Sequence, residues 1–155
     1  MIKNYSTGIA EDKTVGEIMS LLAAKQARSI RIDYDDQGRP AAVSFVLIIS
    51  ELPIPFRLPC NFEGVLKAMA TAYKSGSARY RFERNPESVM QSRRVAWRII
   101  KDWVAAQMAL IEAEQASMAQ VFLPYAIYNE KANLTMFDEF MSQIDSRKQL
   151  PAPKP

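Results

Sequence analysis

"SIRIDYDDQGRPAAVSFVLII", residues 29–49, contains two stretches that have the side-chain pattern of β-strands. Ile30, Ile32 and Tyr34 alternate with charged residues, and this period of two predicts a strand with one solvated face. The segment 35–40 is rich in turn-forming residues. The nearly continuous apolar run "AVSFVLII" that follows predicts a longer, central strand that is covered on both faces. We therefore expect an antiparallel hairpin at the centre of the fold.

The next segment predicts a third strand at the edge of the same sheet. "IPFRLP", residues 54–59, places its apolar side chains on one side. Proline cannot donate a hydrogen bond to a β-ladder, so the prolines in and just before this segment place it at an edge. "RYRFER", residues 79–84, is short and alternating, and predicts either a fourth strand or an extended segment.

Helices are expected before and after these strands along the chain. A capping box from Thr14 to Glu17, followed by apolar residues at helical spacing, predicts a helix over about 14–27. Asn61 is expected to cap a second helix. Three further signals complete the pattern: Asn85-Pro86 starts a long helix, Pro124 stops it after about Leu123, and "NLTMFDEFMSQI" forms a short final helix.

These elements together predict an α+β fold. We expect an antiparallel three- to four-stranded sheet packed against helices on one side, with a long helix in the C-terminal half. The expected organisation is an N-terminal lead-in over 1–13, a single domain over 14–146 and a proline-rich tail over 147–155. A chain of 155 residues is long enough for one self-sufficient core.

The composition disfavours an enzyme. The chain has no histidine and a single cysteine, so the commonest general base, zinc knuckles and Ser/His/Asp or Cys/His nucleophilic schemes are excluded. Neither a GxxxxGK[ST] loop nor a GxGxxG motif is present. We therefore expect binding without turnover, with no cofactor and no metal. Without an apolar signal core or a long apolar run, no membrane association is expected and the location is expected to be cytoplasmic.

Positive charge is concentrated in the middle of the chain. The segment from Lys67 to Lys101 holds nine Lys and Arg against Glu83 and Glu87, which gives it a local charge of +7. Since the whole chain carries +3, the remainder carries −4. This asymmetry predicts an anionic, phosphate-bearing partner.

The main candidate site lies on the long helix, in "RRVAWRIIKDW", residues 93–103. Arg94, Arg98 and Lys101 are spaced i, i+4 and i+7 and so form one basic stripe, in which a solvated charged face is the competing interpretation. Trp97 is expected at the boundary of this stripe, where an indole can stack on a base, whereas Trp103 is expected in the apolar core band.

Residues outside this helix complete the candidate site. Arg79 and Arg81 flank aromatic rings, and Phe82 could take a base while guanidinium groups bind phosphate, although a core or cross-strand position is the favoured interpretation of Phe82. Arg57 lies on the third strand, and Asn61 heads a helix whose N-terminus could hold an anion.

Three phrases, "FRLPCN", "RRVAWRIIKDWVAAQMALIE" and "VFLPYA", together resemble a family of small phage proteins, the Thoeris anti-defence sponges. These sponges sequester cyclic ADP-ribose signals made by TIR-domain enzymes. The resemblance covers about residues 14–128. It implies a homo-oligomeric α+β protein of the host cytoplasm that binds cyclic nucleotides without cleaving them. Some members also hold cyclic oligonucleotides at an arginine-lined site between subunits, a role that Arg94 and Arg98 would suit.

Two other functions remain open from the sequence. One is nucleic-acid binding, because the first five elements have the order α-β-β-β-α of double-stranded-RNA-binding domains, although prolines in the third strand fit that order poorly. The other is a protein that blocks a partner enzyme, with the long helix as its docking or self-association surface. Its apolar side chains fit core packing as well.

Overall fold

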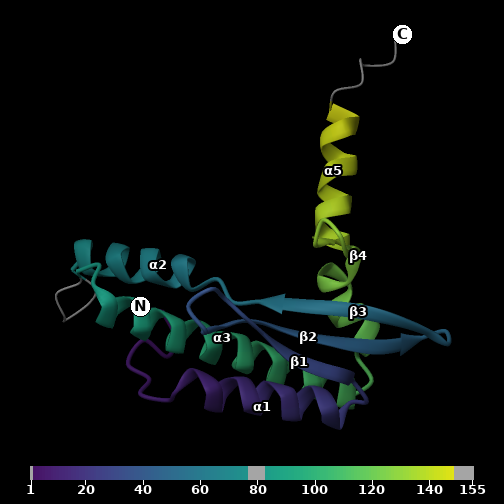
Figure 1. Ribbon diagram of the computed structural model, residues 1–155, viewed down its shortest axis with the longest axis horizontal. Coiled ribbons are helices and arrows are strands. Elements are labelled where there is room, and N and C mark those ends of the chain that lie inside the picture. The colour runs from purple at the N-terminus through teal and green to yellow at the C-terminus, as the bar shows by residue number, and fades with distance from the viewer. Residues whose placement is uncertain (1, 77–82, 149–155) are drawn as a thin grey trace.

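The computed structural model describes residues 2–76 and 83–148 of the chain. The predicted α+β fold is confirmed (Figure 1). The strands of the main sheet are β1 (Arg28–Tyr34), β2 (Pro40–Ile49) and β3 (Leu52–Pro59), and the main helices are α1 (Glu11–Ala24), α2 (Phe62–Lys74) and α3 (Pro86–Glu112). The C-terminal part holds α4 (Met118–Phe122), the 3-10 turn η1 (Leu123–Tyr125), β4 (Ile127–Asn129), β5 (Leu134–Thr135) and α5 (Met136–Lys148).

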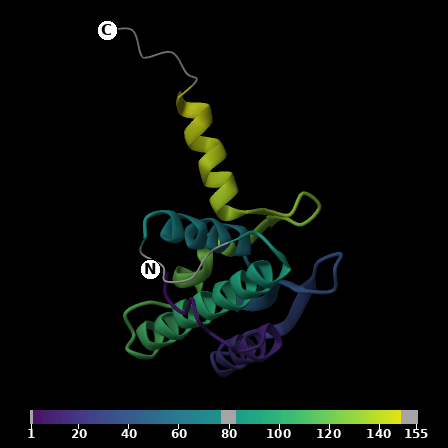
Figure 2. The same cartoon turned by 90° about the vertical axis from the view of Figure 1, so that its left-hand side faces the viewer.

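The sheet has the order β1-β2-β3 with both pairs antiparallel. The predictions that β2 is central and that the proline-containing β3 lies at an edge are therefore confirmed. α1 and α3 run side by side over one face of the sheet, and Figure 2 shows both helices on the same side of it. α2 packs on α3 beyond the end of the sheet (Figure 1).

The core lies between the sheet and helices α1 and α3. Phe45 of β2 stacks on Phe56 of β3 with 5.4 Å between ring centroids. Phe122 of α4 meets Phe45 edge-on at 5.3 Å, and Trp103 of α3 meets Phe122 in the same way at 5.6 Å. These ring contacts attach the returning C-terminal segment to the sheet. A bridge between Phe56 and Ala126 extends that attachment.

The first helix begins earlier than the sequence predicted. α1 spans Glu11–Ala24 rather than 14–27, and its N-cap is Ala10, which has no side-chain capping bond. Thr14 is fully buried inside the helix and its hydroxyl donates to the Ala10 carbonyl oxygen at 3.4 Å. The capping-box prediction was wrong because Thr14 fills a core position. By contrast, Asn61 and Asn85 cap α2 and α3 as predicted, through bonds to the Gly64 and Ser88 amides.

The long helix ends at Glu112, about ten residues before the predicted end. Glu114 adopts a left-handed φ of 56°, and the Gln115 amide bonds back to the Leu110 carbonyl at 2.9 Å, which closes the helix. A new helix then starts at Ser117, whose side chain and that of Gln120 form a reciprocal capping box. The pattern Ser117-x-x-Gln120 is the sequence signal for this break.

The C-terminal part contains a hairpin that the sequence analysis missed. β4 and β5 pair antiparallel and lead into α5, which projects away from the body of the molecule (Figure 1). The final helix was predicted, and it runs to Lys148, slightly beyond the expected domain end at 146. The proline-rich segment 149–155 lies outside the described residues. Within the described part of the chain, no helix is long and apolar enough to span a membrane.

Candidate ligand-binding site

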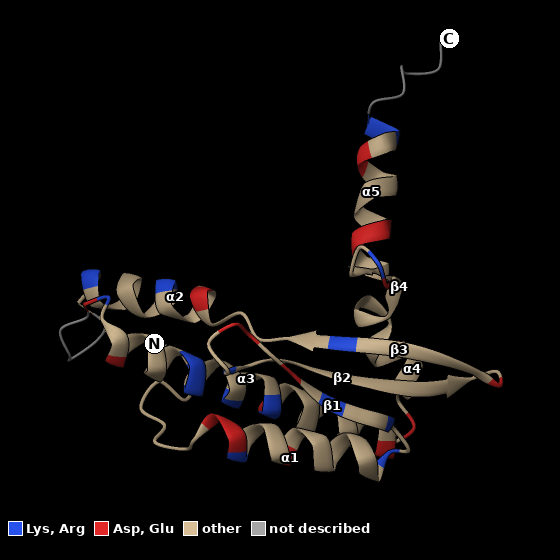
Figure 3. Cartoon of the chain, viewed as in Figure 1, with Lys and Arg blue, Asp and Glu red and all other residues tan. Residues whose placement is uncertain are grey.

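A row of polar side chains crosses the face of the sheet that α1 and α3 leave uncovered. Ser44 of β2 lies directly opposite Arg31 of β1 and Arg57 of β3, and opposite residues of paired strands share a face. Asp33 lies two residues after Arg31 and so projects on the same side. Figure 3 shows basic positions on both β1 and β3. The register of the sheet therefore aligns two arginines from strands that are not adjacent.

Asp33 links the members of this row. Its carboxylate accepts a 2.5 Å hydrogen bond from the Ser44 hydroxyl and ion pairs from Nε of Arg31 at 3.1 Å and Nε of Arg57 at 3.3 Å. Partial burial would raise the pKa of Asp33, but the bonds from Ser44 and Arg31 and the two guanidinium charges outweigh it and lower that pKa. Asp33 is thus ionised at neutral pH, and two cations against one carboxylate leave the row positive.

A hollow of about 410 Å³ lies beside the row, between the sheet and the β4–β5 hairpin. This volume falls within the range of roughly 300–1,000 Å³ that small-molecule sites occupy. It is lined by polar Ser29, Ser44 and Asn133, by acidic Glu130 on the hairpin side, and by apolar Val46, Pro55 and Ile127. Both arginines use Nε to bind Asp33, and among the described residues their terminal nitrogens have no hydrogen-bond partner. Those terminal nitrogens are available to an anionic ligand.

The basic stripe predicted on α3 does not form a continuous surface. Arg98 is only 15% exposed and its Nη1 lies 2.6 Å from the Glu17 carboxylate of α1. Lys101 lies 3.9 Å from Asp102, which also binds Lys3 at 2.9 Å. Arg94 bonds weakly to Gln91 at 3.4 Å and lines a separate hollow of about 330 Å³. Because α1 packs along this side of α3, its Glu17 occupies Arg98, which the helix alone would expose.

Trp97, and not Trp103, is the fully buried tryptophan of α3. Trp97 is 0% exposed, so the expectation that it sits at the edge and stacks on a ligand was wrong. Trp103 is only partly buried and packs edge-on against Phe122 and Tyr125. The core face of α3 is centred about one residue away from the expected one, and it includes Arg93, Trp97, Val104 and Met108.

Arg93 is the buried cation that the sequence analysis did not identify. It is 5% exposed, its Nη2 lies 2.7 Å from Asp35 in the β1–β2 turn, and its guanidinium lies 4.1 Å from the centre of the Phe62 ring. The Arg39 amide and the Arg93 guanidinium lower the pKa of Asp35. The i, i+4 spacing from Arg93 to Trp97 could have revealed this position. Arg93 joins α3, α2 and the turn, which is a structural role.

The remaining predicted site residues fall into three groups. Arg57 lines the hollow on the sheet. Asn61 uses its side-chain oxygen to cap α2 at 3.0 Å, so that atom is engaged within the protein. Arg79, Arg81 and Phe82 lie outside the described residues. Of the predicted site residues that the structure describes, only Arg57 lines the hollow on the sheet. The structure adds Arg31, whose place in the alternating pattern of β1 was visible in the sequence, and Ser44, which lay in a segment predicted as nearly continuous and apolar.

Glu11 is a buried carboxyl group near Arg93. It is 6% exposed, its Oε1 lies 3.5 Å from Arg39, and its Oε2 has no hydrogen-bond partner in the described part of the chain. Burial raises the pKa of Glu11 above its ordinary value, and the charges of Arg93 and Arg39 offset this only in part. The ionised form of Glu11 is therefore disfavoured by folding.

This shift predicts a measurable effect of pH on stability. Because folding raises the pKa of Glu11, this group contributes most to the stability of the fold at pH below its unfolded pKa of 4.5. That contribution is lost as pH rises through the folded pKa of Glu11. The Glu11→Gln variant lacks this titration. Its free energy of unfolding should therefore rise relative to that of the unmodified protein as pH rises from about 4 to 7. Chemical denaturation of both proteins across this range measures the difference between their free energies of unfolding. Carboxylates that both proteins share contribute equally to the two values and cancel in the difference. A difference independent of pH would contradict the assignment.

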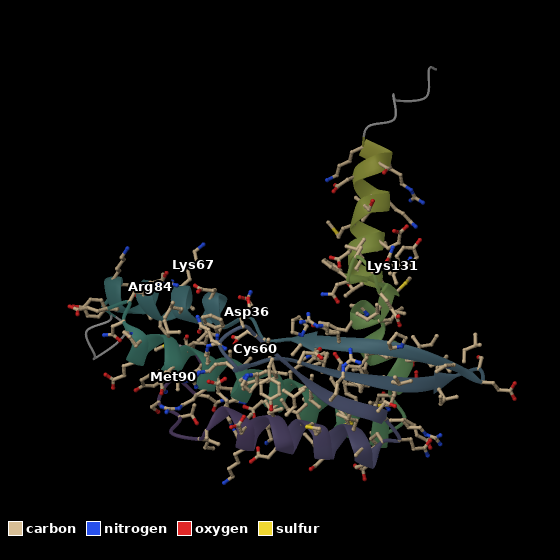
Figure 4. All side chains as sticks on the ribbon, viewed as in Figure 1. Asp36, Cys60, Lys67, Arg84, Met90 and Lys131 are labelled. Atoms are coloured by element: carbon tan, nitrogen blue, oxygen red, sulfur yellow. The ribbon has the colours of Figure 1, made fainter. Side chains whose placement is uncertain are left out.

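Cys60 lies where β3 leads into α2 (Figure 4). Burial, with the nearby charge of Glu11, raises the pKa of the Cys60 thiol to about 12. Only the thiolate reacts with alkylating agents, so iodoacetamide should label the native protein at least about a hundredfold more slowly than the unfolded one at neutral pH. Mass spectrometry of timed samples in buffer and in denaturant measures both rates. Equal rates would show that Cys60 is accessible and ionisable.

Among the residues that the structure describes, no three His, Cys, Asp or Glu side chains gather as a metal site requires. No family model, no curated protein and no solved structure matches this chain.

Proposed function

We propose that this protein binds a cyclic nucleotide signal of the cyclic ADP-ribose class and holds it without converting it, so that a bacterial defence system is deprived of the signal. The observation that carries the proposal is the Arg31–Ser44–Arg57 row beside a hollow of small-molecule size. Guanidinium groups with unoccupied terminal nitrogens bind phosphate oxygens bidentately. The class of ligand comes from the resemblance to the anti-defence sponges.

The two kinds of lining suit the two parts of such a ligand. The phosphates would lie over the arginines, whereas a base or ribose would lie toward Val46, Pro55 and Ile127. Asp33 supports retention over turnover, because its hydrogen bonds and ion pairs lower its pKa and make it a weak base at neutral pH. Like the family that the chain resembles, the protein is proposed to act as a homo-oligomer.

Ligand recovery tests the proposal directly. The protein is incubated with each cyclic ADP-ribose isomer, freed of unbound ligand by gel filtration and heat-denatured, and the supernatant is analysed by mass spectrometry. Intact cyclic ligand should be recovered at near one molecule per site, whereas AMP, with a single phosphate, should be retained much less. Recovery of nothing, or of the linear product only, would contradict non-catalytic sequestration.

Salt dependence separates this function from binding to DNA or RNA. A small ligand held by two arginines should lose affinity gradually with salt, while a polymer that contacts many phosphates loses about 10³–10⁵-fold between 50 and 200 mM salt. Isothermal titration with the cyclic ligand and fluorescence anisotropy with labelled double-stranded RNA give the two slopes. Tight, steeply salt-dependent binding of RNA alone would favour the polymer.

A further inference from the structure

α5 is a helix whose apolar side chains are uncovered. Figures 1 and 2 show it projecting from the body, and none of its residues is buried. Phe137 is 54% exposed and Phe140 57%, and Met136 and Met141 are exposed as well. At 100° per residue, these four side chains and Ile144 share one face of the helix. A single chain therefore presents a continuous apolar stripe to solvent, which soluble proteins generally cover by binding.

The start of α5 is nevertheless well defined. Thr135 and Asp138 exchange bonds, the Thr135 amide donating to the Asp138 carboxylate at 2.9 Å and the Asp138 amide to the Thr135 hydroxyl at 3.3 Å. Acidic residues occupy the first turn and basic residues the last, which favours the helix dipole. Yet an isolated helix of 13 residues is marginal in water, and packing of the apolar face supplies most helical stability. The capping bonds and the end charges therefore favour a helix in this segment, although its apolar face is not packed against the rest of its own chain.

The charges of α5 indicate what covers the stripe. Its base carries Asp138 and Glu139, with Glu130 and Lys131 in the adjoining hairpin turn, and is negative on balance. Its tip carries Arg147 and Lys148 against Asp145, and is positive on balance. Figure 3 shows acidic positions near the base and a basic end at the tip, and Figure 4 labels Lys131 at the base. A second α5 running antiparallel would place each tip against the other base, whereas a parallel pair would oppose like charges.

We propose that α5 is the self-association surface of this protein, and that two copies pair their α5 helices antiparallel about a two-fold axis with the apolar stripes between them. Such an isologous contact needs a self-complementary surface, which the stripe and the opposite charges at its two ends provide. Stable interfaces bury about 800 Å² per partner, more than one stripe offers. The contact therefore extends to exposed apolar residues near the base, namely Leu123, Tyr128 and Leu134.

This assembly surface differs from the one that the sequence suggested. The long helix α3 was the expected docking surface, but Val104 and Met108 are buried in the core of a single chain, and Ile111 packs against that core. The pairing does not depend on which ligand is held, because the hollow on the sheet lies within one copy. A monomeric variant should thus still retain ligand, and failure of either proposal can be recognised separately.

Light scattering coupled to size-exclusion chromatography tests the pairing. The full chain should elute with twice its monomer mass of 17.5 kDa, and Phe137→Glu/Phe140→Glu should reduce the mass to that of one copy. Ser142→Glu, on the opposite side of α5, is the matched control and should leave the dimer intact. All three proteins should unfold cooperatively, since no residue of α5 is buried. A monomeric parent at several hundred micromolar, or a dimer that survives the double substitution, would overturn the proposal.

Cysteine cross-linking tests the direction of the pair. In an antiparallel pair centred on Ser142, position 136 of one copy lies level with position 148 of the other, whereas two copies of position 136 are about 18 Å apart along the axis. A mixture of Met136→Cys and Lys148→Cys proteins should therefore cross-link with a short bismaleimide, and neither protein alone should. The buried Cys60 thiol should contribute little background. Cross-linking of each variant alone would show a parallel pair and overturn the proposed arrangement.

Discussion

Replacing Trp97 with alanine should lower the free energy of unfolding by about 3–5 kcal/mol, the usual cost of emptying a buried aromatic site. The Trp97 side chain is fully enclosed between α3, α1 and the sheet, where it belongs to the main core. Its loss would leave a cavity that the packed helices cannot readily close. Denaturation in guanidinium chloride, followed by circular dichroism, measures the effect.

Two further variants make this prediction specific. Trp103→Ala should cost less than Trp97→Ala, because Trp103 is only partly buried, at the end of the ring cluster with Phe122 and Tyr125. Trp97→Phe should also cost less, since the Trp97 indole nitrogen has no hydrogen-bond partner among the described residues and phenylalanine removes that unsatisfied donor. A larger loss for Trp103→Ala than for Trp97→Ala would restore the orientation of α3 that the sequence suggested.

Removing both arginines of the row on the sheet should nearly abolish retention of the cyclic nucleotide. Hydrogen bonds to charged groups contribute roughly 1.5–3 kcal/mol each. Arg31→Ala/Arg57→Ala should therefore weaken binding by about 10²–10⁴-fold, since each 1.4 kcal/mol is a factor of ten. Isothermal titration gives the affinity. The fold should persist, because Arg31 is exposed, Arg57 is only partly buried and neither belongs to the core.

A second double variant distinguishes the row from the stripe on α3. Arg94→Ala/Arg98→Ala removes the two cations that the sequence favoured, but Arg98 binds Glu17 of α1 and should affect stability more than binding. Arg28→Ala, an exposed arginine of β1 outside the hollow, is the control for loss of general positive charge. If Arg94→Ala/Arg98→Ala abolishes binding with the fold intact while Arg31→Ala/Arg57→Ala does not, the ligand lies at α3 rather than on the sheet.

Several features of the fold could be predicted because they depend on short stretches of chain. Period-two alternation predicted β1, the apolar run predicted a central β2, and the prolines of β3 predicted an edge. Asn61 and Asn85 were identified as helix caps from their own identity and the residues that follow them. The break in the long helix also had a local signal, the capping pattern of Ser117 and Gln120. The prediction instead ended the helix just before Pro124.

The candidate site could be predicted only in part. The alternation of β1 placed Arg31 and Asp33 on a solvated face, and Arg57 was a candidate, but only the strand register brings them into one row with Ser44. The partners of two α3 cations come from distant segments, since Arg98 binds a residue 81 positions away and Arg93 one 58 positions away. Helical spacing identifies which side chains share a face of the helix. It does not identify which distant segment packs against that face.

The sequence by itself determined where the strands of the main sheet and most of the helices form, because backbone conformation, capping and turn chemistry depend on neighbouring residues. Only the tertiary structure decided which side of α3 is buried, which cations keep free nitrogens and that the stripe of α5 is left uncovered. Apolar residues lie on nearly every side of α3 between Val95 and Ile111, so its orientation follows from the packing of α1 and the sheet. Contacts between distant segments settle such choices, and no local pattern encodes them.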